Sequence, residues 1–203
     1  MARLDSGFFL RDTVKVAQDL LGRYLVRQWD GERVVCRITE TEAYVGAVDK
    51  ACHAYGGRMT ERTRTLYAAP GTIYVYLIYG MYHCLNFVTE AEGTAAAVLI
   101  RGGEVVWGKE RAANLRFQKD YEALTAAQRR SLANGPGKLC KALSIDRHLN
   151  GCPITGDALY LVDALPELSL PERLLSQPFL TGKRIGIDYA EEAVDFPWRF
   201  WLE

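Results

Sequence analysis

The chain has 203 residues, of which 49% are hydrophobic and 25% charged, and its 25 Lys and Arg balance its 25 Asp and Glu. These values are typical of one globular domain with a packed core. A formal net charge of zero counts against a globally basic nucleic-acid binder, although local basic patches stay possible. No long apolar run predicts a membrane span, and the first residues lack the plan of a signal peptide.

The five cysteines are odd in number and include no CxxC pair, which predicts reduced thiols in a cytoplasmic protein. Two of them adjoin histidines, in Cys52-His53 and His83-Cys84. Neighbouring residues on an extended chain point to opposite faces, so each pair converges poorly on a metal ion. We therefore expect no metal site.

The first segments of the chain predict a helix followed by a β-hairpin. Asp12 can cap a helix over 13–21, which Gly22 would end. Strands are expected at 24–28 and 33–44, because β-branched and apolar residues flank a connection that contains Asp-Gly.

A polar, irregular stretch at 45–69 is followed by a tyrosine-rich one at 71–86. A structureless segment as long as the first tends to be functional in a compact domain. The second is typical of strands, and alternation would put Tyr74 and Tyr76 on one face. Two interpretations fit it: an aromatic core strand with its hairpin, or the wall of an amphipathic cavity or stacking platform.

The remaining chain mixes strands and helices. We expect a strand at 95–101, an irregular start and a basic helix within 103–119, a short helix from Thr125 to near Ala133, a helix at 138–143, and strands at 159–162, 181–187 and 196–202. Strands scattered between helices without a regular βαβ alternation predict an α+β domain.

Two acids and a tyrosine alternate along the strand expected at 33–44. In an extended strand Glu40, Glu42 and Tyr44 share one face, with the two carboxylates roughly 7 Å apart along the backbone. An unpaired buried carboxylate is costly, so this face suits the lining of a wet cleft. A solvated strand face without a function is the alternative.

Six segments carry a resemblance to a known family. They are Thr39-Glu-Thr-Glu-Ala-Tyr-Val-Gly46, His53-Ala-Tyr-Gly-Gly-Arg58, Pro70-Gly-Thr-Ile-Tyr-Val-Tyr-Leu-Ile-Tyr-Gly-Met-Tyr82, Leu85-Asn86, Leu99-Ile-Arg101 and Gly135-Pro-Gly-Lys-Leu-Cys140. In this order they resemble the alkyladenine (3-methyladenine) DNA glycosylase family of the mammalian type, in a compact form similar to bacterial members. The resemblance implies one α+β glycosylase domain over 1–203, with a curved, mainly antiparallel sheet and surrounding helices, related to formyltransferase C-terminal domains.

The same resemblance implies a monofunctional base-excision-repair enzyme that binds duplex DNA as a monomer, in the cytoplasm at the nucleoid. Such an enzyme flips a damaged purine out of the duplex and hydrolyses the bond between base and deoxyribose, leaving an abasic site. Alkylated purines are the expected substrates, with deaminated and etheno purines also implied. Water and one carboxylate suffice for this reaction, so no cofactor is expected.

The family pattern assigns the hydrolytic centre to a few residues. Glu42 would be the general base that deprotonates water for attack at C1′, and its charge would stabilise the oxocarbenium-like sugar. Arg101 would help to hold that water and a nearby phosphate. A main-chain carbonyl around Ile187, with the register open between Ile185 and Ile187, would complete the water site, and Glu40 is given no catalytic role.

The base pocket would be formed by four further residues. Tyr44 and Tyr76 would sandwich the purine, with cation–π attraction for alkylated, cationic bases. His53 would line the pocket, and Asn86 would crowd the exocyclic amino group of guanine. Alternatively, His53 is a structural histidine and Asn86 pins a turn.

DNA contacts are expected outside the pocket. Tyr79 would be the wedge that fills the gap in the stack, supported by Met81 and Tyr82. The candidates for phosphate contacts, each of which could instead be merely solvated, are Arg58, Arg62, Arg64, Lys138 and Lys141. Two departures from the family, His83 in place of an aromatic residue and a longer stretch at 89–97, bear on lesion range but not on the hydrolytic centre.

Rival functions from other classes stay open. A non-catalytic binder of damaged DNA would keep the pocket and wedge but would not need both Glu42 and Arg101. An RNA-binding module of the formyltransferase C-terminal type would have no use for Glu42 in a cavity. A combined glycosylase and lyase needs an amine nucleophile, and the matched pocket segments contain no lysine.

Overall fold

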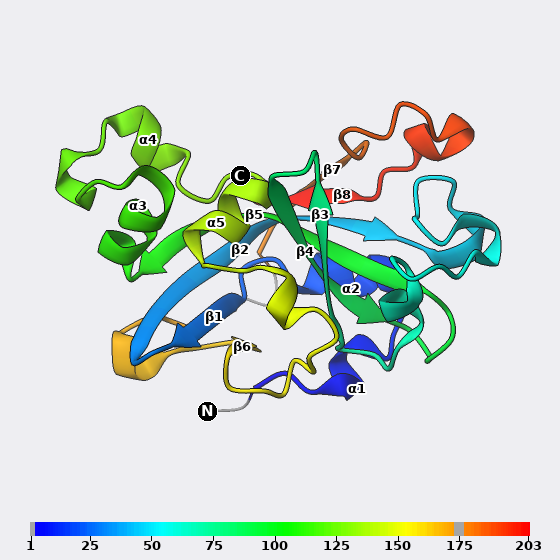
Figure 1. The fold of residues 1–203 in the computed structure, drawn as a ribbon, viewed down its shortest axis with the longest axis horizontal. Coiled ribbons are helices and arrows are strands. Elements are labelled where there is room, and N and C mark those ends of the chain that lie inside the picture. The colour runs from blue at the N-terminus through cyan, green and yellow to red at the C-terminus, as the bar shows by residue number, and fades with distance from the viewer. Residues whose placement is uncertain (1–2, 173–176) are drawn as a thin grey trace.

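The computed structural model describes residues 3–172 and 177–203, which form one curled antiparallel sheet with helices around it (Figure 1). The predicted α+β class with a curved antiparallel sheet is therefore confirmed. The strands are β1 (Tyr24–Trp29), β2 (Glu32–Tyr44), β3 (Ile73–Ile78), β4 (Tyr82–Thr89), β5 (Ala96–Trp107), β6 (Leu159–Val162), β7 (Leu180–Gly182) and β8 (Arg199–Trp201). They run in the order β3-β4-β5-β2-β1-β6, while β8 pairs with both β2 and β7.

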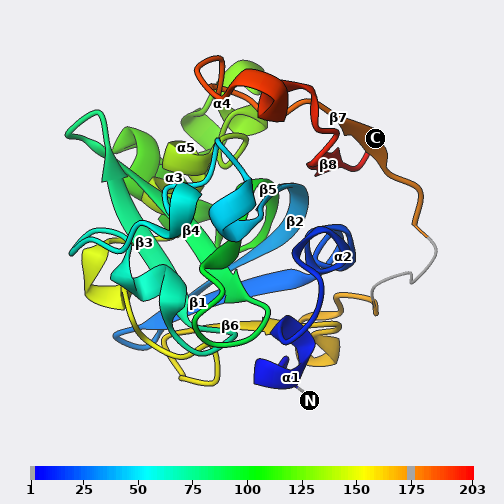
Figure 2. The ribbon, with the colours of Figure 1, turned by 90° about the vertical axis from the view of Figure 1, so that its right-hand side faces the viewer.

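The α-helices of the described residues are short. They are α1 (Ser6–Phe9), α2 (Thr13–Asp19), α3 (Lys109–Phe117), α4 (Ala126–Arg130) and α5 (Pro136–Ala142). Helix α2 packs against β2 and β5, whereas α5 contacts α3, β4 and β5 (Figure 2). None of the helices in the described ranges is long and apolar enough to cross a membrane.

Local signals set the helix starts much as predicted, whereas α2 and α4 end at Asp19 and Arg130, earlier than the predicted 21 and 133. The Asp12 carboxylate accepts a hydrogen bond from the Lys15 N–H at 2.9 Å and so caps α2. Thr125 begins α4 with a capping box completed by Gln128. Helix α5 starts at Pro136, earlier than the predicted 138–143, because a proline lacks the N–H that the first turn leaves unused.

The prediction of an irregular start at 103 was wrong, because β5 continues through Gly103 to Trp107. Gly103 does not interrupt the strand; because it lacks a side chain, it allows β2 to approach β5 closely. A Cβ on Gly103 would collide with the Cys36 sulfur and lie 2.7 Å from the Arg37 carbonyl oxygen.

The closing strands are also shorter than the predicted 181–187 and 196–202. Strand β7 ends at Gly182, and the chain then leaves the sheet and turns toward the end of β2. Hydrogen bonds to β2 residues and to the loop that follows β2 replace the expected strand pairing. This departure brings the segment after Gly182 to the site described below.

Strand β2 changes partner at the residues predicted to be functional. Its first half pairs with β1 up to Arg37, whereas Glu40 to Glu42 pair with β8. Its register with β5 is irregular between Ile38 and Glu40 and between Glu40 and Thr41. Irregularities of this kind re-aim side chains, here at the junction between two neighbouring strands.

Two of the hydrophobic clusters among the described residues contain the elements around this region. The larger packs sheet residues such as Phe87 and Phe200 against helix residues such as Leu139. The smaller contains Tyr74 and has the rings of Tyr44 and Tyr76 packed against it. The aromatic strand is thus partly core, as one of the two interpretations held, but part of it also lines a cavity.

Candidate active site

Glu42 lies at the centre of a fully partnered polar cluster. Its side chain is 0% exposed. One carboxylate oxygen accepts the Tyr44 hydroxyl at 2.9 Å, and the other accepts the Ile185 N–H at 2.9 Å. The Arg101 Nε lies 3.6 Å from the second oxygen. The predicted pair of Glu42 and Arg101 is therefore brought together by β2 and β5.

This environment acts on the acidity of Glu42 in two directions. Burial raises its pKa, while the Arg101 charge, the Ile185 N–H and the Tyr44 hydroxyl lower it. Burial and the charge of Glu42 hold the pKa of Tyr44 well above its usual value. The phenol therefore stays protonated and donates a hydrogen bond to the Glu42 carboxylate. The carboxylate is thus a stronger base than one in water, held by three donors.

Glu40 is an ion-pairing residue. Its carboxylate lies 3.0 Å from Arg101 Nε and 2.5 Å from Arg199 Nε, and its side chain is 19% exposed. Arg101 bridges the two acids, so Glu40 and Glu42 share a face of β2, as alternation predicted. The alternative of a solvated strand face does not hold for either acid.

The four predicted pocket residues line one cavity. Tyr44, His53, Tyr76 and Asn86 face it together with Tyr74. The rings of His53 and Tyr76 meet edge-to-face with centroids 4.7 Å apart, and those of Tyr74 and Tyr76 lie 5.3 Å apart. Sequence reasoning had not assigned Tyr74 to the pocket, although strand alternation with Tyr76 already placed it on the same face.

The cavity is small, with a volume of about 20 Å³. That is room for about one water molecule and not for a purine. The guanidinium of Arg62 lies over the Tyr76 ring, 5.3 Å from its centroid. A base can enter only if the side chains around Tyr76 move.

The remaining polar groups of the pocket are held by protein partners. His53 Nδ1 lies 3.2 Å from the Tyr74 hydroxyl. Partial burial, and then the charge of Arg62, lower the pKa of His53 to about 4, so the imidazole is neutral at pH 7. The Asn86 amide donates to the carbonyls of Tyr74 at 3.2 Å and Cys84 at 3.4 Å. These bonds fix the direction in which both side chains face. They agree with the structural alternative for His53, whereas Asn86 lies within strand β4 and pins no turn.

The main-chain neighbour of Glu42 is Ile185, one of the two residues between which the sequence left the register open. The Ile187 carbonyl accepts the Ala190 N–H at 2.8 Å, and its side chain is 3% exposed. Ile185 reaches the carboxylate through its N–H. The segment leaves the sheet after β7, so strand spacing does not decide between Ile185 and Ile187. The carbonyl expected at the water site stays a prediction.

The turn between β3 and β4 presents the predicted wedge. Tyr79 is 82% exposed and has φ +53°, a left-handed conformation that is uncommon for a residue with a side chain. Met81 and Tyr82 beside it are 67% and 43% exposed. Gly137 of α5 packs directly against Tyr82, where an added Cβ would lie 2.9 Å from the ring. Helix α5 therefore supports the tip.

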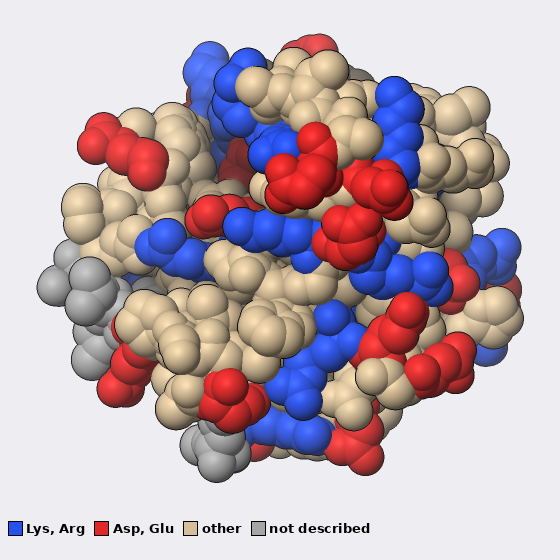
Figure 3. Space-filling model, turned by 90° about the vertical axis from the view of Figure 1, so that its left-hand side faces the viewer, with Lys and Arg blue, Asp and Glu red and all other residues tan. Residues whose placement is uncertain are grey.

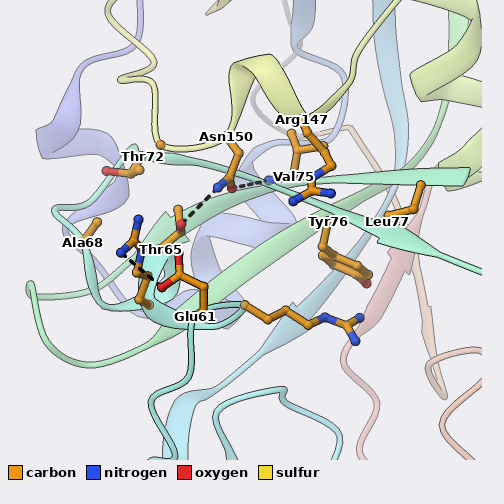
Figure 4. Close-up of a pocket in the computed structure, with 12 residues that line it drawn as sticks. Glu61, Thr65, Ala68, Thr72, Val75, Tyr76, Leu77, Arg147 and Asn150 are labelled. Atoms are coloured by element: carbon orange, nitrogen blue, oxygen red, sulfur yellow. Dashed lines mark hydrogen bonds and ion pairs between the residues drawn. The ribbon is translucent and has the colours of Figure 1, made fainter. Parts of the chain in front are cut away.

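The five predicted phosphate contacts are all exposed. Arg62 and Arg64 line an open groove of about 840 Å³ along β3, together with Tyr76 and with Arg147, which sequence reasoning missed (Figure 4). Asn150 fixes one wall by accepting the Val75 N–H at 3.0 Å and donating to Thr65 at 3.2 Å.

The other basic candidates lie elsewhere. Lys141 of α5 borders a hollow that also includes Met81 and Tyr82. Lys138 donates to Asn134 at 3.0 Å, and Arg58 belongs to the loop before the groove. On the side where α3 and α4 lie, basic and acidic side chains are interspersed, without a large area of one sign (Figure 3).

Among the described residues, no group of three or more His, Cys, Asp and Glu is close enough to hold a metal ion. The pairs Cys52-His53 and His83-Cys84 take part in no such group. Four of the cysteines are buried, all five are free thiols, and burial raises the pKa of Cys52 to about 11.

Comparison with known proteins agrees with this arrangement. The family model described as "Methylpurine-DNA glycosylase (MPG)" matches residues 7–203. A relative from Clostridium perfringens (strain 13 / Type A) is 50% identical over 204 residues, covering 99% of this chain and 96% of the relative. Relatives from Desulfitobacterium hafniense (strain Y51) and Clostridioides difficile (strain 630) are 49% and 45% identical, over 100% and 98% of this chain and 96% and 100% of their own lengths. All three carry the name "Putative 3-methyladenine DNA glycosylase". The chain therefore belongs to the methylpurine-DNA glycosylase family and is a DNA glycosylase, a hydrolase of DNA repair.

Proposed function

We propose that the whole chain acts as one monomeric domain that flips damaged purines out of duplex DNA and hydrolyses their glycosidic bond, leaving an abasic site. The observation that carries the proposal is the Glu42 carboxylate, buried and held by three donors beside a tyrosine-lined cavity. Hydrolysis of this kind needs a base for water and a negative charge near the sugar, and one carboxylate can supply both.

Glu42 is the general base in this proposal. The raised pKa of Glu42 makes its carboxylate a better proton acceptor. The positive charge of Arg101 acts in the other direction and favours the ionised form that is ready to take a proton. As the sugar gains oxocarbenium character, the carboxylate lies in a dry environment where its charge is poorly screened. Arg101, shared with Glu40, orients the carboxylate and the water. The main chain at Ile185, rather than at Ile187, borders the water site.

The purine enters between Tyr44 and Tyr76 once the cavity opens. Arg62 and the Tyr76 ring are the groups that must shift, and side-chain changes of this size are common when a surface binds its partner. The two phenol rings then contact an electron-poor base, which favours alkylated purines. Deaminated and etheno purines are further substrates, with neutral His53 facing the base and Asn86 set against guanine.

DNA binds across the surface of the protein that carries the turn between β3 and β4, at the β3 end of the sheet. Tyr79 enters the stack at the vacated position, with Met81 and Tyr82 against the neighbouring bases. The basic groove beside β3 and the lysines of α5 contact phosphates on the two sides of this turn.

The test uses methylated DNA together with short duplexes that carry a single hypoxanthine, ethenoadenine or 7-methylguanine. Mass spectrometry of the supernatant should detect the free damaged base, and alkali should then break the strand at the abasic site. Glu42→Gln serves as the inactive variant and an undamaged duplex as the substrate control. Failure of the wild-type chain to release any purine would refute the proposal.

The same experiment separates the rival functions. Tight binding of a lesion duplex without release of the base would indicate a non-catalytic damage binder. Strand breakage before alkali, with a covalent adduct trapped by borohydride, would indicate a lyase. Preference for RNA over lesion duplex would indicate an RNA-binding module.

A further inference from the structure

Arg184 and Asp49 form an ion pair that is completely buried beside the active site. Both side chains are 0% exposed, and the pair is bidentate, with Nη1–Oδ2 at 2.5 Å and Nη2–Oδ1 at 2.8 Å. Desolvation makes a buried ion pair weak evidence for stability, since apolar residues often do as well. A role other than stability is therefore the better explanation for this pair.

The pair ties together three segments of the chain. Arg184 also donates to the Ala43 carbonyl at 2.8 Å and to the Ala193 carbonyl at 3.2 Å. Asp49 accepts the N–H groups of Val45 at 3.1 Å and Ala51 at 3.0 Å. The end of β2, the loop after it and the segment after β7 are thus held at a single point.

Several contacts of Arg184 are adjacent to a group of the active site. The guanidinium carbon of Arg184 lies over the Tyr44 ring, 4.8 Å from its centroid, and Arg184 does not line the cavity that Tyr44 faces. Ala43, whose carbonyl it binds, lies between Glu42 and Tyr44 in the chain. The residue after Arg184 is Ile185, whose N–H binds the Glu42 carboxylate.

We propose that Arg184 and Asp49 are positioning residues for hydrolysis, whose ion pair backs the Tyr44 ring and places the Ile185 N–H against the Glu42 carboxylate. The inference rests on the proposed role of Glu42 as the base. Two of the three donors to Glu42, the Tyr44 hydroxyl and the Ile185 N–H, then depend on one guanidinium. Neither Arg184 nor Asp49 touches the substrate in this scheme.

The effect of losing the Arg184–Asp49 ion pair on the pKa of Glu42 depends on the charged and titratable groups that surround Glu42. Arg101 faces it from β5, Glu40 and Tyr44 from β2 and Cys84 from β4, while Arg199 of β8 is bound to Glu40. The Tyr44 hydroxyl and the Ile185 N–H both lower the pKa of Glu42. If they drift away while Arg101 stays, Glu42 should hold its proton to higher pH.

The experiment measures the titration of Glu42 in the full chain by ¹³C NMR of its carboxyl carbon, assigned with Glu42→Gln. Two variants loosen the pair: Arg184→Lys keeps the charge but not the planar fork, and Asp49→Asn keeps the shape but not the charge. The matched control is Asp163→Asn, which breaks the ion pair of Arg23, an arginine that is also largely buried (8% exposed side chain).

We expect the midpoint of Glu42 to rise by about one pH unit in Arg184→Lys and Asp49→Asn, the size expected for one charge-assisted hydrogen bond. The acid limb of single-turnover excision should move upward with it, and Asp163→Asn should change neither. A merely structural pair would lower the melting temperature and the active fraction at every pH without moving either midpoint.

An unchanged Glu42 midpoint in both variants would overturn the inference. So would failure of both to fold at 25 °C, because the pair would then serve the fold as a whole. If wild-type chain released no base, the proposed function would fall, while the NMR midpoints would still decide whether this pair positions the donors of Glu42.

Discussion

The surroundings of Glu42 and the turn between β3 and β4 are built on opposite plans, although the proposed reaction needs both. Glu42 is 0% exposed and receives two hydrogen bonds and an ion pair. Tyr79 at the turn is 82% exposed, in a left-handed backbone conformation. The donors around Glu42 are in place before any substrate binds. The turn, in contrast, exposes an aromatic ring that only a binding partner can bury.

This contrast follows from the two tasks. A base that meets developing positive charge acts best when its donors are already in place and water is excluded, since no reorganisation is then required. A wedge gains its energy from apolar area that is removed from water on binding, so it must stay exposed until then. Changes in the first region should therefore affect the chemical step, and changes in the second should affect flipping and binding.

The largest expected effect is on the chemical step. Glu42→Gln removes the proton acceptor and should slow single-turnover excision about a thousandfold, within the usual range of ~10²–10⁴ for a general base. Duplex binding should change little, because the side chain is buried. Gel-shift affinity measured in parallel provides the control. Excision within tenfold of wild type would remove Glu42 from its role.

The same substitution should stabilise the fold at neutral pH. The folded chain raises the pKa of Glu42 above its ordinary value of 4.5, so folding favours the protonated form. The stability linked to Glu42 is present below that ordinary value and is lost as the pH rises through the raised one. A neutral glutamine should raise the melting temperature at pH 7 by about 2–4 °C. The gain should vanish in acid, and a decrease at pH 7 would contradict it.

A smaller effect is expected at the exposed turn. Tyr79→Ala should reduce single-turnover excision from duplex DNA by about tenfold to a hundredfold, since stacking of one aromatic ring on a base is worth ~1–3 kcal/mol. The loss should shrink when the lesion lies in a mismatch that already flips easily. Trp107→Ala, which truncates another exposed aromatic residue at the end of β5, is the control. Equal losses in the two variants would argue against a wedge.

The smallest effect concerns the basic groove. Arg147→Ala should weaken duplex binding several-fold for damaged and undamaged DNA alike. It should also reduce the slope of log affinity against log salt by about one, as for one lost phosphate contact. Arg111→Ala on α3, where Arg111 pairs with Glu32 at 2.7 Å, should leave the slope unchanged. An equal slope of log affinity against log salt in the wild-type chain, Arg147→Ala and Arg111→Ala would exclude Arg147 from the DNA contact.

Much of the site could be predicted from local patterns. Period-two alternation on β2 put Glu40, Glu42 and Tyr44 on one face, and the shared ion pairs with Arg101 agree with it. The motif around Tyr76 gave the aromatic wall of the cavity. Helix starts at Asp12 and Thr125 followed from side chains that bind the backbone a few residues away. Such features need only neighbours in sequence.

What local patterns missed depended on segments far apart in the chain. Gly103 indicated a break in the sequence, yet β5 runs through it because Cys36 approaches closely from β2. The choice between Ile185 and Ile187 at Glu42 stayed open in the sequence, because the chain leaves the sheet after β7 and Ile185 reaches Glu42 through a tertiary contact. Arg147 joined the groove with Arg62 through tertiary packing alone.

The sequence by itself determined the family, the α+β class, the curved antiparallel sheet and two of the groups beside Glu42, Tyr44 and Arg101. Only the tertiary structure decided that the tyrosine-lined cavity measures about 20 Å³, that Glu42 is buried, and that Arg184 and Asp49 form a buried pair behind Tyr44. The physical reason is that alternation and motifs fix the direction of a side chain along its own strand. Cavity size, burial and ion pairing depend on how closely distant segments approach one another.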